Sequence, residues 1–133
     1  MKVKEVMTKG VDFVNRFDSV YYASLKMSKD NVGALPVFDG DIVIGMITDR
    51  DITIRLVAVK KDPKKTKVTE IMTPEVHVCS EEDSLETAAE QMMKKQVRRL
   101  LVKNDIGHIT GVISLADLAR NIDQDLVAEV LRK

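Results

Sequence analysis

The sequence predicts an α/β fold made of two copies of one strand–helix–strand–strand–helix unit. The first observation is a repeated segment: GMITDRD at residues 45–51 and GVISLAD at residues 111–117 share glycine, isoleucine, a hydroxyl residue and aspartate at equal spacing. The second is a common register, because a shift of 65 residues lays VKEVMTKGV, which starts at residue 3, on VTEIMTPEV, which starts at residue 68. The third is the alternation of short apolar runs with segments of helical spacing. Together they indicate a tandem duplication.

Each copy is predicted to open with a short strand and a helix, continue with two strands, and close with a second helix. Asp18 and Asp83 stand where they could cap the first helices, and Glu86 gives Asp83 a capping-box spacing. The second helices are expected to begin near Asp49 and Leu115. The predicted strands are residues 11–14, 34–38 and 42–48 in the first copy, and 76–79, 100–102 and 108–114 in the second.

The predicted boundaries follow the duplication. Copies of roughly 55 residues are marginal for an independent core, so the halves are expected to pack together. The lysine-rich segment KKDPKKTK between them reads better as a solvated linker than as a phosphate-attracting patch. Apolar residues four apart near the end predict a last helix that packs on its own chain or on a twin subunit. The resulting division is repeat 1 at 1–59, the linker at 60–67, repeat 2 at 68–121 and the helix at 122–133.

Composition limits the function without naming it. The 133 residues carry 21 basic and 21 acidic side chains, a balance that argues against nucleic-acid binding. No apolar run is long enough to span a membrane, and the first residues do not resemble a signal peptide. A single cysteine, Cys79, cannot form an internal disulfide, which favours a reducing cytoplasm. His77 and Cys79 could suggest metal ligands, but without a second pair ordinary strand residues are the better interpretation.

The repeated motif has two interpretations. Thr48 with Asp51, and Ser114 with Asp117, have the spacing of a capping box at a helix start. However, the reciprocal cap prefers the longer glutamate, and no cap requires the glycine three residues before the hydroxyl. Glycine there permits close approach of a ligand or of another backbone. A carboxylate one turn into the helix could accept hydrogen bonds from a ribose diol. Spacing alone leaves cap and ligand site equally supported.

The duplicated segments VMT…ALPV…GMITDRDI and IMT…VRRLLV…GVISLADL resemble the tandem CBS-domain pair, or Bateman module, over residues 1–121. The resemblance implies two β-α-β-β-α repeats related by pseudo-two-fold symmetry. It also implies a regulatory module that binds an adenosyl ligand such as AMP, ADP, ATP or S-adenosylmethionine in clefts between the repeats. The motif aspartate would hold the ribose hydroxyls, and the motif hydroxyl would contact ribose or phosphate.

The resemblance assigns residues from both copies to each cleft. The first cleft would contain Asp117, Ser114, Val112, Arg99, Thr8, Asp12, Val32, Gly33 and Ala34. The second would contain Asp51, Thr48, Met46, Thr73, His77, Val97 and Arg98. Because the first copy has no basic pair matching Arg98 and Arg99, the clefts should differ in charge, and the Asp117 cleft is favoured for an anion.

No phosphate-binding loop, catalytic triad or cofactor motif is present, so neither an enzyme nor a resident cofactor or metal is expected. The first hypothesis is a cytoplasmic homodimer that senses an adenine nucleotide and signals to another protein by population shift. The alternative is a dimerisation or docking scaffold whose clefts bind nothing. Two preserved aspartates favour the sensor.

Overall fold

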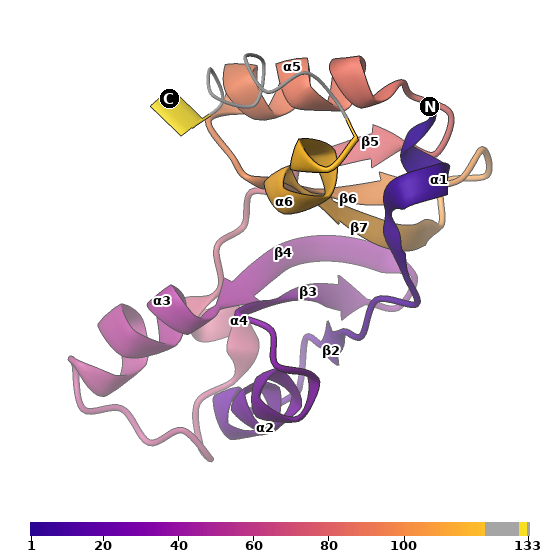
Figure 1. Cartoon of the computed structure of the whole chain (residues 1–133). Coiled ribbons are helices and arrows are strands. Elements are labelled where there is room, and N and C mark those ends of the chain that lie inside the picture. Colours follow the sequence, from indigo (N-terminus) through magenta and orange to yellow (C-terminus); the bar gives the residue numbers. More distant parts are fainter. Residues whose placement is uncertain (122–130, 133) are drawn as a thin grey trace. The chain divides into compact units, whose positions relative to one another are not determined.

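The computed structural model describes residues 1–121, 131 and 132, and it divides the chain into two compact units (Figure 1). Unit 1 combines residues 1–11 with the chain from residue 77 onward, and unit 2 is residues 12–76. Almost all of the predicted last helix, with its apolar residues Ile122, Leu126 and Val130, lies outside the described residues.

Unit 2 packs one face of a three-stranded sheet, ordered β2-β3-β4, against apolar residues of its helices. Strand β2 is parallel to β3, and β3 is antiparallel to β4. Leu35, Val37 and Ile47 alternate with residues of the opposite face and fill the core, as the period of two in a strand requires. The elements are β2 (Val14–Asn15), α2 (Val20–Asp30), β3 (Ala34–Asp39), β4 (Ile42–Thr48), α3 (Asp49–Ile52), the π-helix η1 (Thr53–Val57) and α4 (Val68–Ile71).

Unit 1 repeats this arrangement and adds a strand, giving the order β1-β7-β6-β5. Leu100, Val102 and Ile113 are the core residues equivalent to those of unit 2. The elements are α1 (Val3–Val6), β1 (Thr8–Lys9), β5 (Val78–Ser80), α5 (Leu85–Lys95), β6 (Arg99–Lys103), β7 (Ile109–Ser114) and α6 (Leu115–Ala119). The predicted α/β class and two-repeat build are confirmed.

The first segment of each repeat lies in the unit formed by the rest of the other repeat. Strand β1, at the start of repeat 1, pairs antiparallel with β7 near the end of repeat 2. In unit 2, Thr73 from the start of repeat 2 pairs with Met46 of β4 through two backbone hydrogen bonds of 2.8 Å. The compact units therefore do not coincide with the sequence repeats. The duplication alone does not predict this exchange, although the resemblance placed Thr8 and Thr73 at the motif of the opposite repeat.

The predicted caps of the first helices were wrong by one residue. Ser19 and Ser84 are the N-caps of α2 and α5, and each serine hydroxyl accepts a hydrogen bond of 3.1 Å from a backbone N–H three residues on. Asp18 and Asp83 instead close the preceding turns by accepting from the N–H three residues before them. The first strands are also shifted, because β2 begins at Val14 and β5 at Val78.

Candidate functional site

The repeated hydroxyl and aspartate form a capping box in both copies. The Thr48 hydroxyl accepts from the Asp51 N–H at 3.0 Å, and Asp51 Oδ2 accepts from the Thr48 N–H at 3.0 Å. The equivalent distances between Ser114 and Asp117 are 3.2 and 2.9 Å. The capping interpretation is therefore confirmed for α3 and α6. It leaves a ligand role open, because a carboxylate has more acceptor capacity than one cap uses.

The motif glycines, Gly45 and Gly111, allow a backbone segment from the other repeat to pass close to the motif strand. A Cβ on Gly45 would lie 2.7 Å from the carbonyl oxygen of Thr73 and 2.8 Å from the Met72 sulfur. A Cβ on Gly111 would lie 2.7 Å from the carbonyl oxygen of Thr8 and equally close to the Met7 sulfur. The sequence allowed two reasons for these glycines, the close approach of a ligand or of another backbone segment. The structure shows another backbone segment at both positions. The exchanged segment of each unit thus lies directly beside the motif strand.

The Asp51 carboxylate has a second hydrogen-bond donor besides the Thr48 N–H. The Thr73 hydroxyl donates to both carboxylate oxygens of Asp51, at 3.0 Å to Oδ1 and 3.2 Å to Oδ2. Asp51 is 6% exposed, one of only two buried polar residues in the described part of the chain. Strand β4, helix α3 and the segment after α4 thus converge on one carboxylate, which the cap and a side-chain hydroxyl both hold.

Asp117 has no such partner among the residues of unit 1 that the structure describes. Thr8, the residue equivalent to Thr73, is exposed and makes no side-chain hydrogen bond within the described residues. Asp117 Oδ1 lies 3.7 Å from Arg120 Nη1, which is too far for a hydrogen bond. Arg120 was not among the predicted site residues, since nothing in the duplication marks it. The two motif carboxylates are therefore chemically different although their caps match.

Cross-strand neighbours of the motif differ in charge. In unit 1, Arg99 pairs with Ser114, so the two share the sheet face that lies away from the core cluster. In unit 2, Ala34 pairs with Thr48 in the equivalent position. Arg99 is exposed, so its guanidinium is available to an anion at the Ser114 end of this face. Of the two motif hydroxyl residues, Ser114 has an arginine as its cross-strand neighbour and Thr48 has an alanine.

Several other predicted residues also lie close to a motif of their own unit. The Gly33 carbonyl accepts from the Asp49 N–H at 2.9 Å, and the Arg98 carbonyl accepts from the Leu115 N–H at 2.8 Å. Each contact ties the segment before a strand to the start of the helix that carries the motif aspartate. Residues placed beside the motifs by strand pairing are Met46 and Thr73 in unit 2, and Thr8 and Val112 in unit 1.

The remaining assignments join residues of different units and stay predictions. Asp117 lies in unit 1, whereas its expected partners Asp12, Val32, Gly33 and Ala34 belong to unit 2. Asp51 lies in unit 2, whereas His77, Val97 and Arg98 belong to unit 1.

Asp12 has a local partner in unit 2. Its Oδ1 accepts from Lys26 Nζ at 2.9 Å, and this hydrogen bond lowers the pKa of the Asp12 carboxyl. An anionic ligand would therefore meet at Asp12 a carboxylate that is already paired with a lysine.

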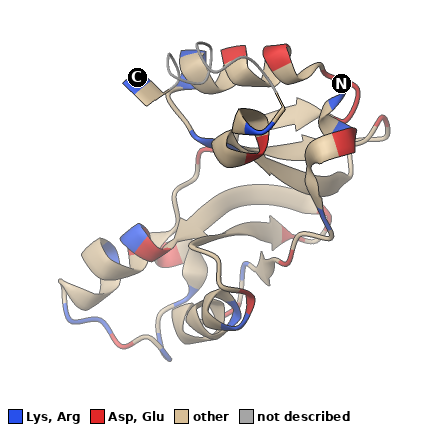
Figure 2. Cartoon of the chain, in the orientation of Figure 1, with Lys and Arg blue, Asp and Glu red and all other residues tan. Residues whose placement is uncertain are grey.

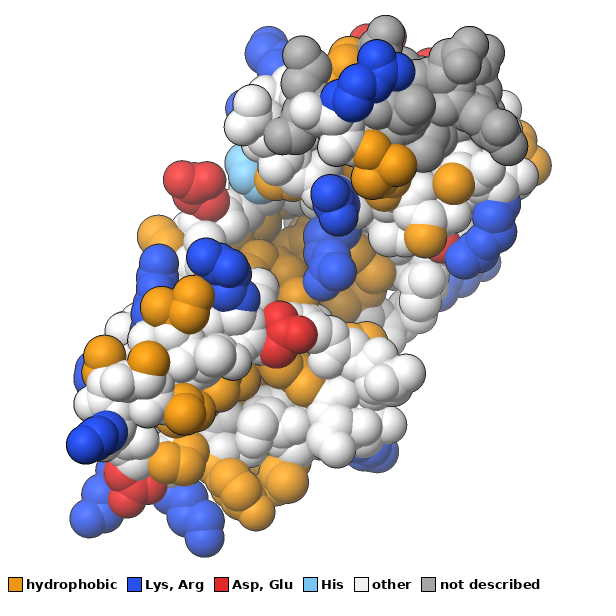
Figure 3. Space-filling model, turned by 60° about the vertical axis from the view of Figure 1, so that its left-hand side comes forward, with side chains coloured by type: hydrophobic (Ala, Val, Ile, Leu, Met, Phe, Trp, Pro, Cys, Tyr) orange, Lys and Arg blue, Asp and Glu red, His pale blue; other side chains and the backbone are white. Residues whose placement is uncertain are grey.

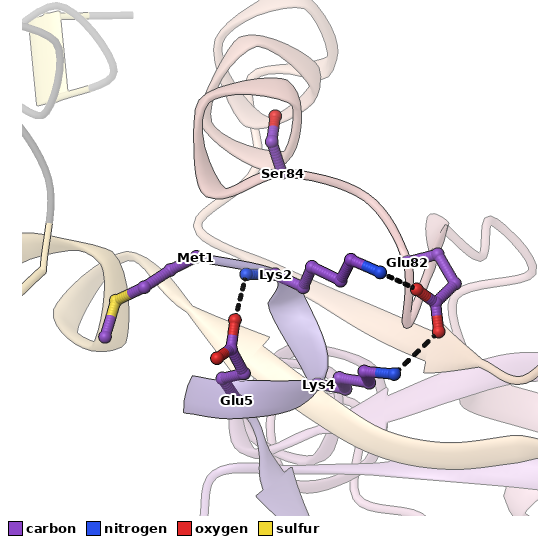
Figure 4. A pocket seen from close by; sticks show the side chains of 6 residues that line it. All are labelled: Met1, Lys2, Lys4, Glu5, Glu82 and Ser84. Carbon is purple, nitrogen blue, oxygen red and sulfur yellow. Dashed lines mark hydrogen bonds and ion pairs between the residues drawn. The ribbon is translucent and has the colours of Figure 1, made fainter.

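A pocket at the N-terminal end of unit 1 lies apart from these residues. Figure 4 shows that Lys2 and Lys4 both reach Glu82, which accepts a hydrogen bond from each ammonium group. The two cations hold the pKa of the Glu82 carboxyl at about 2, and the three side chains neutralise one another in part. Since the lysines are already paired, the pocket is a poor anion site. Its lining residues are Met1, Lys2, Lys4, Glu5, Glu82 and Ser84.

Other kinds of site find little support. Within residues 1–121, 131 and 132, no cluster of three or more histidine, cysteine, aspartate or glutamate side chains could hold a metal ion. Burial raises the pKa of the Cys79 thiol to about 11, so it is neutral at physiological pH. Basic and acidic residues are interspersed along the chain of both units (Figure 2). The described helices include none with the length and apolarity of a membrane span.

Comparison with known proteins places the geometry in context. The family model described as "CBS domain" matches residues 3–58 and again residues 68–124. The CBS domain-containing protein YhcV of Bacillus subtilis is 38% identical over 119 residues, which cover 90% of this chain and 84% of that protein.

Solved structures agree. A conserved CBS-domain protein of unknown function from Thermoplasma acidophilum has a TM-score of 0.85 at 22% identity, with 99% of this chain and 75% of that chain covered, and it shows the fold alone. The crystal structure of CBSX2 in complex with AMP has a TM-score of 0.72 at 26% identity, with 90% and 93% covered.

Proposed function

Because this chain belongs to the CBS-domain family and contains two such domains in tandem, we propose that it is a regulatory module that binds an adenine nucleotide. The observation that carries the proposal is the state of Asp117. Its Oδ2 serves the cap, while its Oδ1 accepts no hydrogen bond from the residues that the structure describes and lies 3.7 Å from Arg120 Nη1. A ribose offers two adjacent hydroxyl donors, and a carboxylate with spare acceptor capacity on a fixed helix start fits that pair.

The phosphate side of the ligand is assigned to Arg99. Its exposed side chain stands opposite Ser114 on the sheet face that lies away from the core cluster, so a ribose on Asp117 would bring its phosphate towards an arginine. The relative CBSX2, solved with AMP, supports an adenine nucleotide as the ligand class. The candidates are AMP, ADP, ATP and S-adenosylmethionine, and the cation favours the phosphorylated ones.

Signalling would follow from the two-unit construction. The residues assigned to each ligand by resemblance come from both units, so a ligand that contacts both would favour one arrangement of the units over others. A separate regulated protein would then bind that arrangement. The proposed module has no catalytic role of its own, and its proposed location is the cytoplasm.

Homodimer formation is the second part of the proposal. Helix α2 exposes Tyr21, Tyr22 and Leu25, each at least 40% accessible, and Phe17 just before the helix is 68% accessible. Figure 3 shows hydrophobic and basic side chains side by side on the surface of unit 2. A second copy that covers α2 would bury this apolar area. Sedimentation should find a dimer that Leu25→Glu dissociates. A monomeric wild type would remove this part alone.

Calorimetric titration and thermal shift with AMP, ADP, ATP and S-adenosylmethionine test the nucleotide proposal. At one hundred times its dissociation constant, a ligand should stabilise the folded chain by about 2.7 kcal/mol. Asp117→Asn keeps the side-chain shape and removes the charge, so it should abolish the shift. Asp51→Asn serves as the matched control in the other repeat. No shift with any of the four at millimolar concentration would favour the scaffold alternative.

A further inference from the structure

The Thr73 hydroxyl already donates a hydrogen bond to the Asp51 carboxylate, the group that a ligand at the Thr48–Asp51 motif would need. It donates to both oxygens of Asp51, at 3.0 and 3.2 Å, while the Thr48 N–H already donates to Oδ2 at 3.0 Å. Asp51 is buried, so water does not compete effectively with these donors. The carboxylate is satisfied within the protein before any ligand arrives.

The equivalent hydroxyl in unit 1, that of Thr8, does not hydrogen-bond to the carboxylate of Asp117. Thr8 and Thr73 have the same position in the duplicated sequence, and each lies beside the motif strand of its unit. Thr8 is exposed and donates no hydrogen bond to Asp117. Besides the arginine neighbour of Ser114, the two motifs therefore differ in whether the equivalent threonine hydroxyl hydrogen-bonds to the aspartate.

We propose that the Thr73 hydroxyl weakens the binding of ribose at Asp51. Nucleotide then binds first at Asp117, and it binds at Asp51 only at higher concentration. This inference rests on the proposed function, since it concerns the same ligand. A ribose diol that binds Asp51 must displace or share the Thr73 hydroxyl, whereas at Asp117 no side chain in the described part of the chain donates to the carboxylate. Losing a hydrogen bond to a charged group corresponds to roughly a tenfold change in affinity.

The Thr73 hydroxyl could instead help ligand binding at Asp51, and removing it would then change the affinity in the opposite direction. If the Thr73 hydroxyl orients Asp51 for the ligand, its removal weakens binding at Asp51. If it competes with the ligand, its removal strengthens that binding. Thr73→Val removes the hydroxyl at nearly constant shape, Thr73→Ser keeps it, and Thr8→Val is the matched control in unit 1. Thr73→Ala is a second hydroxyl-free variant, used where valine lowers the melting temperature.

The experiment is calorimetric titration with AMP, with each aspartate changed to asparagine in turn to assign the sites. Wild type should bind one AMP tightly, in a step that Asp117→Asn removes and Asp51→Asn does not. Thr73→Val and Thr73→Ala should strengthen the second, Asp51-dependent step about tenfold. Thr73→Ser and Thr8→Val should leave it unchanged. Unaltered or weaker binding at Asp51 in both hydroxyl-free variants would overturn the inference while the Asp117 step upheld the proposed function.

A measurement without ligand tests the hydrogen bond separately. In carboxyl ¹³C NMR spectra, the Asp51 signal should move in Thr73→Val but not in Thr73→Ser or Thr8→Val. An Asp51 signal that does not respond would also overturn the inference, whatever AMP does. If the signal responds and no variant binds AMP, the contact exists but the proposed function fails, and the inference about ribose fails with it.

Discussion

The carbonyl oxygen of Thr73 lies 2.7 Å from the point that a Cβ on Gly45 would occupy, and the carbonyl oxygen of Thr8 has the same relationship to Gly111. Each glycine thus marks where the exchanged segment crosses the motif strand of the other repeat. In unit 2 the side-chain hydroxyl of the same threonine, Thr73, donates to the carboxylate of Asp51.

Adding a methyl group at either glycine should destabilise the protein. In Gly45→Ala and Gly111→Ala the new Cβ meets a backbone carbonyl, so a strand must move, at a cost of about 1–3 kcal/mol. Gly33→Ala is the control, because its Cβ would meet only the exposed Asp49 carboxylate at 2.9 Å, which can turn away. Urea denaturation measures the difference. Equal losses in all three variants would mean that the backbone contact is not the cause.

Truncating the two aspartates should have unequal effects on stability. Asp51→Ala and Asp117→Ala each remove one half of a capping box, which is worth about 1 kcal/mol. Asp51→Ala also leaves the half-buried Thr73 hydroxyl without its acceptor, so it should cost more. Denaturation midpoints of the two variants without nucleotide provide the comparison. A larger loss for Asp117→Ala would contradict the difference between the carboxylates.

Removing the Arg99 charge should affect phosphate more than ribose. In Arg99→Ala, affinity for AMP should fall about tenfold, as expected for one hydrogen bond to a charged group, while affinity for adenosine stays nearly constant. The loss should shrink at high salt, since Arg99 is exposed. The matched variant Ala34→Arg places the same charge beside Thr48 in unit 2. Equal losses for AMP and adenosine would assign Arg99 a structural role.

The buried thiol should give the stability a pH dependence in alkaline solution. Burial raises the Cys79 pKa from 9.0 to about 11, so the folded state holds its proton where the unfolded state has lost it. The contribution to stability is complete below pH 9 and is lost as pH rises towards 11. Cys79→Ala should have a flatter profile over this range. In the folded wild type the thiol should react with a disulfide reagent far more slowly than in denaturant.

Glu82 should stay ionised in acid. Hydrogen bonds from Lys2 and then Lys4 lower its pKa from 4.5 to about 2, so its favourable contribution holds above pH 4.5 and is lost as pH falls towards 2. In an NMR titration, Lys4→Ala should move the Glu82 midpoint upward. High salt should act in the same direction, because all three groups are exposed. A midpoint unaffected by either change would rule out pairing in solution.

The sequence predicted what is encoded locally. Residues 42–48 form the predicted strand without error, and α3 and α6 begin at the predicted positions, because strand period and capping chemistry involve neighbours in the chain. The caps of α2 and α5 were missed by one residue because an aspartate and a serine stand side by side at each start, and either side chain suits an N-cap.

The repeat pattern did not predict which strands, far apart in the sequence, pair with each other. Aligning one copy with the other shows that 3–11 matches 68–76, but not which sheet each segment joins. The capping box was one of two explanations that spacing allowed. The Thr73 hydrogen bond depends on a rotamer next to a buried carboxylate, and no spacing predicts that one copy makes it while the other does not.

The exchanged segments also bear on how each unit is completed. Neither repeat is a closed structure: residues 68–121 lack the edge strand that residues 8–9 supply, and residues 12–59 lack the segment around Thr73. Because donor and acceptor segments stand on one chain, each unit obtains its missing segment from a covalently linked neighbour, and this pairing does not depend on the concentration of a second molecule.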